Sequence, residues 1–166
     1  MTPEPEGHIV ELEIRLDAPP HEVFRYLVDP ERYVQWQGVR AELDPRPGGA
    51  FRVWMDAHTV ASGEYVAVEA PVRVVFTWGC EGSEEVPPGS TMVELRLRAE
   101  GDRTVLTLRH TGLPDERDAI MHREGWDSFT NRLRLVVRGQ DPGPLSGPPA
   151  EASLKEKPKE RDRDAR

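Results

Sequence analysis

Two histidines and one glutamate are the residues of this chain whose positions could support chemistry. His110 ends a run of alternating residues, His122 begins a helical stripe, and Glu64 lies in another alternating run. An imidazole titrates near neutral pH, and a carboxylate beside it can complete an acid/base pair or help to orient a ligand. We expect all three to point into an otherwise apolar interior. The alternative for each histidine is a half-buried ring bonded to a neighbour, and for Glu64 a carboxylate that meets solvent at a strand end.

Strand alternation predicts which side chains share that interior, because successive residues of a strand point to opposite faces. The expected inward sets are Val74, Phe76 and Trp78 in one strand, and Leu106, Leu108 and His110 in another. By the same parity Glu64 aligns with Val66 and Val68, unless a bulge at Gly63 shifts the register. Phe76, Trp78 and Leu108 would therefore line the space around His110.

A long C-terminal helix is predicted from Asp115 to Arg138 by steps of four and three residues. Its apolar stripe contains His122, Trp126, Phe129, Leu133 and Val136. Gly139 supplies the stop. Aromatic residues at such spacing are core residues first and walls of a cavity second. Gly125 lies in the middle of this helix, where glycine lowers helix stability by about 1 kcal/mol relative to alanine. We interpret this glycine as allowing close approach of the helix to the sheet; the alternative is that it leaves space for a ligand.

The remaining pattern predicts an α+β fold. Alternating runs predict strands at 10–16, 51–56, 59–69, 72–78, 91–99 and 103–111, and two short helices are expected from residue 20 to Asp29 and at 30–36. Short turns between consecutive strands imply an antiparallel sheet. One sheet face is charged and should meet solvent, and the other is apolar and should pack on the long helix.

Composition limits the partners and the compartment. The 166 residues carry 30 acidic and 22 basic side chains, a net charge of −8, which disfavours nucleic acid as a partner. No apolar run approaches the roughly 20 residues of a membrane-spanning helix, so no membrane insertion is expected. The lone Cys80 cannot form an internal disulfide, and the N-terminus lacks the features of a signal peptide; together they predict a cytoplasmic protein.

The chain divides into one domain with two appendages. We expect an N-terminal extension at 1–7, a folded domain at 8–139 and a disordered tail at 140–166, because the tail holds five prolines and no aromatic residue. A docking tail or a short charged helix is the alternative. The sequence shows no phosphate loop, nucleophile elbow or dinucleotide fingerprint. The five histidines lack metal-ligand spacing, so neither a cofactor nor a metal is expected.

Six short motifs in order carry a resemblance to a known superfamily. They are Ala18–Phe24, Pro30–Trp36, Pro47–Val53, Val75–Trp78, Leu106–Pro114 and His122–Trp126. Over about residues 8–138 the chain resembles the START-like (SRPBCC, helix-grip) superfamily, in the branch named after the activator of the 90-kDa heat-shock protein ATPase. The resemblance implies a curved antiparallel sheet of six or seven strands wrapped around a long C-terminal helix, with a cavity between them.

The resemblance also implies three functions. The first is binding of a small hydrophobic or aromatic molecule in that cavity, with no residue assigned to catalysis. The expected ligand-binding residues are Glu64, Phe76, Trp78, Leu108, His110, His122, Trp126 and Phe129. The second is a co-chaperone or regulatory role with a protein partner; an exposed Trp54 would also suit a homodimer. The third is a polyketide cyclase/dehydratase-like enzyme, in which His110 or His122 would act with Glu64 in proton transfer.

Overall fold

The structure is a computed structural model that describes residues 7–143. The expectations for residues 1–6 and for the tail from residue 144 onward lie outside the described residues. Within residues 7–143, no helix is both long and apolar enough to cross a membrane.

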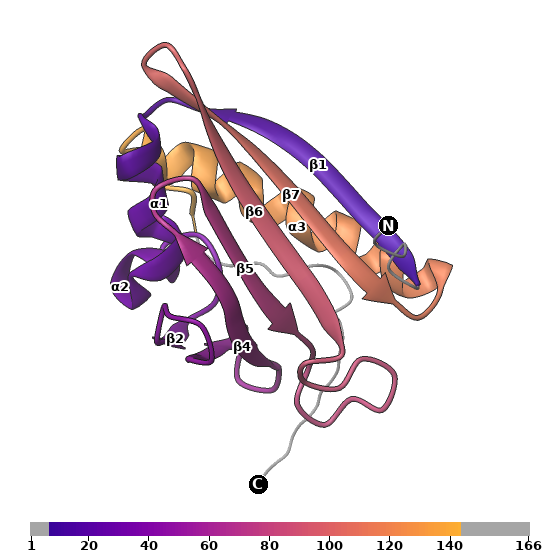
Figure 1. Cartoon of the computed structure of the whole chain (residues 1–166). Coiled ribbons are helices and arrows are strands. Elements are labelled where there is room, and N and C mark those ends of the chain that lie inside the picture. The colour runs from indigo at the N-terminus through magenta and orange to yellow at the C-terminus, as the bar shows by residue number, and fades with distance from the viewer. Residues whose placement is uncertain (1–6, 144–166) are drawn as a thin grey trace, which may run out of the picture.

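Seven strands form one antiparallel sheet, and a long helix lies across it (Figure 1). The strands are β1 (His8–Leu16), β2 (Arg40–Leu43), β3 (Ala50–Trp54), β4 (Val60–Glu69), β5 (Arg73–Trp78), β6 (Thr91–Glu100) and β7 (Arg103–Leu113). The helices are α1 (Pro20–Val28), α2 (Pro30–Tyr33) and α3 (Glu116–Val137). The sheet order is β1-β7-β6-β5-β4-β3-β2, so the first strand pairs with the last. The predicted α+β fold is confirmed.

Two elements differ from the expectation. The sequence pattern missed β2, which has only four residues and forms one edge of the sheet, so it carries too little alternation to detect. The second short helix ends at Tyr33 instead of near Trp36. The residues after it continue in turns, and Gly38 adopts a positive φ of 83° before β2 begins.

Aspartates start two of the helices. The Asp29 carboxylate accepts a hydrogen bond from the Glu31 amide at 3.0 Å, and the Asp115 carboxylate accepts one from the Asp118 amide at 2.8 Å. These bonds satisfy amides that have no partner in the first turn of a helix. The cap at Asp115 therefore fixes where α3 begins, directly after the turn that follows β7.

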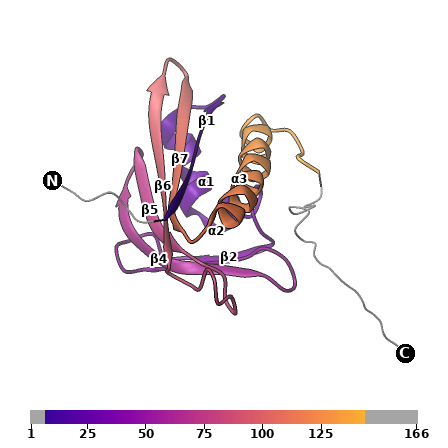
Figure 2. The same ribbon diagram turned by 90° about the vertical axis from the view of Figure 1, so that its right-hand side faces the viewer.

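Helix α3 lies on the concave face of the sheet, alongside β1 and β7 (Figure 2). Gly125 is buried, in agreement with the close approach expected for it. The Arg123 guanidinium donates to the backbone carbonyl of Glu11 at 3.3 Å. This bond occupies a carbonyl of the edge strand β1, which helps to protect the edge from pairing with another chain.

Ion pairs cover the convex face of the sheet, as the charged faces of the strands predict. Arg73 and Arg96 both lie against Glu94, at 2.7 and 2.9 Å. Arg109 pairs with Glu11 across β7 and β1 at 3.0 Å. Arg96 and Glu11 are well exposed, so the pairs that they form contribute at most about 1 kcal/mol each. The convex face is a solvated face, and the core lies on the other side.

Gly63 lies where the backbones of β4 and β5 leave no room for a side chain. A Cβ atom on this residue would lie 2.1 Å from the Thr77 carbonyl oxygen. We predict that Gly63→Ala lowers the free energy of unfolding by about 2 kcal/mol, because the backbone of β5 cannot yield as a flexible side chain would. Urea denaturation measures the change. Val66→Ala, at an exposed position of the same strand, should cost less than about 1 kcal/mol; equal costs for the two variants would contradict the steric explanation.

Candidate functional site

His110 is the centre of a buried hydrogen-bond chain that connects helix and sheet. The Trp126 indole on α3 donates to His110 Nδ1 at 3.0 Å. His110 Nε2 lies 2.8 Å from the Thr91 hydroxyl on β6, and Thr91 donates to the Trp78 carbonyl oxygen at 2.7 Å. The His110 side chain is fully buried. Its ring is therefore buried and bonded to its neighbours, while its role in binding a ligand stays a prediction.

The partners of His110 determine its tautomer. An indole N–H can only donate, so Nδ1 of His110 must be the acceptor and its proton must sit on Nε2. Nε2–H then donates to Thr91, whose own proton is directed at the carbonyl of Trp78. Burial, and to a lesser degree the charge of His122, lowers the pKa of His110 to about 3. The imidazole is neutral at neutral pH, and both of its nitrogens are occupied.

His122 lies beside His110 and is half-buried. The two rings meet edge to face with centroids 5.1 Å apart. His122 Nδ1 lies 2.8 Å from the Asp118 backbone carbonyl, an acceptor, so Nδ1 carries the proton and Nε2 is the acceptor nitrogen. Burial lowers the pKa of His122, and the hydrogen bond to Asp118 opposes this effect. The structure therefore brings both predicted histidines together.

Glu64 does not join them. Its side chain is exposed, and the neighbouring Tyr65 is the buried residue. The register of β4 against β5 shifts between Tyr65 and Ala67, so a parity counted back from Val68, which packs on the core, reverses before it reaches Glu64. The expected inward position of Glu64 is wrong, and the bulge that causes the error lies after Glu64 and not at Gly63.

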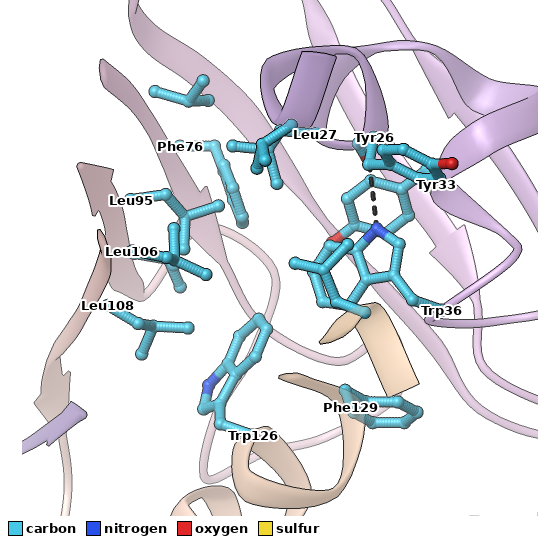
Figure 3. Packing of buried hydrophobic residues seen from close by; sticks show 14 of the residues in the cluster. Tyr26, Leu27, Tyr33, Trp36, Phe76, Leu95, Leu106, Leu108, Trp126 and Phe129 are labelled. Atoms are coloured by element: carbon cyan, nitrogen blue, oxygen red, sulfur yellow. Dashed lines mark hydrogen bonds between the residues drawn. The ribbon is translucent and has the colours of Figure 1, made fainter. Parts of the chain in front are cut away.

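The other predicted site residues form the wall between the sheet and α3. Phe76, Trp78, Leu108, Trp126 and Phe129 are all buried. Figure 3 shows Trp126 projecting from α3 toward Leu106, Leu108 and Phe76. The Trp78 and Trp126 rings contact each other with centroids 5.3 Å apart. These five residues occupy the positions that the sequence predicts for them, while their role in binding stays a prediction.

Sequence reasoning missed two aromatic residues at this wall. Phe51 stacks on Phe76 with centroids 4.0 Å apart and an interplanar angle of 13°. Tyr65 contacts both rings edge to face, at 5.9 and 6.1 Å. The alternation of Phe51 with Arg52 could have indicated the first. The bulge in β4 conceals the second, because it leaves Tyr65 and Val68 on the same side.

Two buried polar atoms in this wall have no hydrogen-bond partner among the described residues: the Tyr65 hydroxyl and the Trp78 indole Nε1. A third buried polar group nearby is paired, since the Tyr33 hydroxyl donates to the Gln37 side-chain oxygen at 2.5 Å. Leaving a buried donor without a partner costs about 1–3 kcal/mol. Unpaired buried groups in a native structure therefore call for a reason.

The interior between sheet and helix is closed around its side chains. Phe76, Leu106 and Leu108 expose 0% of their surface. The described residues do not confirm an open cavity at this position. A surface pocket of about 460 Å³ lies elsewhere, at the C-terminal end of α3, where Arg132, Val136 and Gly139 contribute to its wall. No three His, Cys, Asp or Glu side chains within residues 7–143 are grouped so that they could hold a metal ion.

A family model and a solved structure assign the chain to one family. The family model described as "Activator of Hsp90 ATPase homolog 1-like protein" matches residues 17–138. The solution structure of an AHSA1-like protein from Rhizobium etli is 36% identical, covers 96% of each chain and has a TM-score of 0.68. The crystal structure of DynU16, from the dynemicin biosynthetic locus, is 25% identical, covers 82% of this chain and 50% of its own, and has a TM-score of 0.72.

More distant structures share the fold. An Hsp90 activator from Plasmodium falciparum is 19% identical, with a TM-score of 0.66 over 80% of this chain and 97% of its own. The Aha1 dimer from Colwellia psychrerythraea is 13% identical, with a TM-score of 0.69 over 79% and 96%. Among curated proteins, an uncharacterized protein of Schizosaccharomyces pombe is 34% identical over 62 residues. That match spans 37% of this chain and only 18% of the length of the curated relative.

The lowered pKa of His110 predicts a pH-dependent stability. The unfolded chain has the ordinary histidine pKa of 6.5, so between that pH and about 3 it binds more protons than the folded chain. The free energy of unfolding should therefore fall as the pH drops through this window, by up to about 1.4 kcal/mol per pH unit from this residue. Urea denaturation at pH 7, 6, 5 and 4 measures the slope.

His110→Gln is the matched control for that titration. A glutamine amide can accept from Trp126 and donate to Thr91 without a titrating proton. The variant should show a smaller slope than the wild type between pH 6 and 4, since the carboxylates contribute equally to both. Equal slopes in the two proteins would contradict a neutral, buried His110.

Removing each of the two buried tyrosine hydroxyls should have opposite effects on stability. Tyr33→Phe breaks the bond to Gln37 and should lower the free energy of unfolding by about 1–3 kcal/mol. Tyr65→Phe removes a hydroxyl without a partner and should leave stability unchanged or raise it by about 1 kcal/mol. Thermal and urea denaturation of both variants make the comparison. A loss in Tyr65→Phe as large as that in Tyr33→Phe would show that the Tyr65 hydroxyl is paired.

Proposed function

Because the chain belongs to the Activator of Hsp90 ATPase homolog 1-like family, we propose that it binds a small hydrophobic or aromatic molecule between the sheet and α3. The ligand-binding residues in this proposal are Phe76, Trp78, Leu108, His110, His122, Trp126 and Phe129. His110 acts in it by holding Trp126 through its hydrogen bond, and His122 supplies the polar side of the wall. Catalysis is not part of the proposal.

One observation supports it above the others: aromatic rings, and not the helix backbone, span the space between α3 and the middle of the sheet. The backbone of α3 lies alongside β1 and β7 (Figure 2). Its contact with β5 is made by side chains, through the rings of Trp126 and Trp78. Ligand sites are lined mainly by apolar and aromatic side chains with a few polar groups. A planar aromatic molecule bound there would make, with the wall residues, the same kind of ring contacts that these residues now make with one another.

The closed interior limits how such a molecule enters. The wall residues Phe76, Leu106 and Leu108 have no exposed surface, so α3 and the sheet must separate before a ligand can reach them. Association should therefore be slower than diffusion allows, because the binding-competent state is a minor one.

The relatives and the remaining surfaces bear on the alternatives. DynU16 comes from a biosynthetic locus, which is a small-molecule setting. The enzyme alternative needs an acid/base pair, yet Glu64 is exposed while His110 is fully buried.

The co-chaperone alternative has the description of the family in its favour. The convex face of the sheet carries solvated ion pairs such as Arg109–Glu11. The free thiol of Cys80 suits the cytoplasmic location that we propose with this function.

Tryptophan fluorescence with fluorene, an apolar tricyclic probe, tests the proposal. We expect saturable quenching with one fluorene per chain, confirmed by native mass spectrometry, because Trp78 and Trp126 lie in the wall. Trp54→Phe is the control variant: Trp54 stacks between Arg40 and Arg52, away from the wall, so its removal should leave the affinity unchanged. Trp126→Phe should weaken binding at least about fivefold.

Two results would overturn the proposal. One is the absence of any one-to-one complex with fluorene in both measurements. The other is binding that Trp54→Phe abolishes and Trp126→Phe leaves intact, which would place the probe on the convex face. Circular dichroism of each variant checks that the fold is kept.

A further inference from the structure

We propose that the molecule bound between sheet and α3 is a neutral aromatic compound with acceptor oxygens, to which the Trp78 indole and the Tyr65 hydroxyl donate hydrogen bonds. This inference rests on the proposed function and adds the chemical class of the ligand. It assigns to Tyr65 a role that the sequence pattern did not indicate.

Two deeply buried donors lack hydrogen-bond partners. Trp78 exposes 4% of its surface and Tyr65 exposes 1%. Neither the indole N–H of the one nor the hydroxyl of the other has a hydrogen-bond partner among the described residues. Such groups lose their bonds to water on folding and receive nothing in return. A ligand oxygen would restore both bonds.

Neighbouring donors of the same kind are paired. The Trp36 indole donates to the Tyr26 carbonyl at 2.9 Å, a bond drawn in Figure 3. The Trp126 indole donates to His110, and the Tyr33 hydroxyl donates to Gln37. The fold thus provides acceptors for other buried indoles and phenols of this interior. Among the fully enclosed indole and phenol groups within residues 7–143, the Trp78 N–H and the Tyr65 hydroxyl are the ones without a partner.

Both donors adjoin one aromatic surface. The stacked rings of Phe51 and Phe76 lie within 6.4 Å of the Trp78 ring, and within 6.1 Å of the Tyr65 ring, measured between centroids. Tyr65 is opposite Phe76 in the sheet register, and Trp78 follows two residues later on the same strand. An aromatic molecule that packs on the phenylalanine pair is near both donors.

The surroundings also select for a neutral compound. His110, the histidine that contacts Trp78 edge to face, is neutral because burial lowers its pKa to about 3. A carboxylate placed at this position would be desolvated without a cation to balance it. Carbonyl, ether and phenol oxygens accept hydrogen bonds without that penalty. The geometry therefore favours oxygenated aromatics over aromatic acids.

A matched pair of probes tests the inference: fluorene and 9-fluorenone share one tricyclic skeleton and differ by a carbonyl oxygen. We measure the dissociation constant of each by isothermal titration calorimetry. In the wild type, 9-fluorenone should bind about tenfold tighter than fluorene, the effect expected of one or two net hydrogen bonds. Because both probes fill the same space, the ratio of the two constants is insensitive to changes in packing.

Three variants locate the donors. Trp78→Phe and Tyr65→Phe should each lower the ratio, and the double variant should bring it to about one. Because Trp78 also belongs to the wall, the ratio of the two dissociation constants, and not the affinity for fluorene, is the readout for these variants. Tyr33→Phe removes a hydroxyl that is already paired, so it is the control and should keep the wild-type ratio.

The outcomes separate this inference from the proposed function. Equal binding of the two probes by the wild type would overturn the inference and leave the proposed function standing. A wild-type ratio that survives in either single variant removes that residue from the proposal, and survival in the double variant overturns it. Failure of both probes to bind would overturn the proposed function and, with it, the inference.

Discussion

The position of α3 depends on the hydrogen bonds that run from Trp126 through His110 and Thr91 to the backbone of Trp78. They connect four elements: α3, β7, β6 and β5. The bond from Trp126 requires an unprotonated Nδ1 on His110, and donation to Thr91 requires a proton on Nε2. Both bonds therefore form together only with the neutral, Nε2-protonated imidazole, which burial favours. Buried polar networks are costly when only partly satisfied, and this one is complete. It holds the Trp126 ring against Trp78, and the aromatic wall follows from that placement.

The strand faces could be predicted from the sequence wherever a strand runs without interruption. In β5 and β7 the inward residues Phe76, Trp78, Leu108 and His110 are buried as the alternation predicts. The apolar stripe of α3 could be predicted in the same way, and its residues Trp126 and Phe129 are both buried. Successive side chains of a regular strand always alternate between the two faces of the sheet. A few arginines on the outer face therefore predict which residues lie on the inner face.

The errors come from features that alternation cannot encode. The register shift between Tyr65 and Ala67 reverses parity inside β4, so Glu64 lies outside and Tyr65 takes its place. The pairing of buried polar groups was also out of reach, because it depends on residues far apart in the chain: Thr91 and His110 come from different strands. The sequence indicated which residues would meet, and only the structure shows that Trp78 and Tyr65 are left without partners.

The pairing of β1 with β7 has a consequence for the synthesis of the protein. Arg109 and Glu11 pair across these strands although 98 residues separate them in the chain. The first strand to leave the ribosome must therefore wait for the last strand before its backbone finds a partner, and α3, which covers β1, arrives later still. Contacts of such long range slow folding and prolong the exposure of unpaired edges. Nascent chains that stop before residue 103 should be the ones that need protection from aggregation.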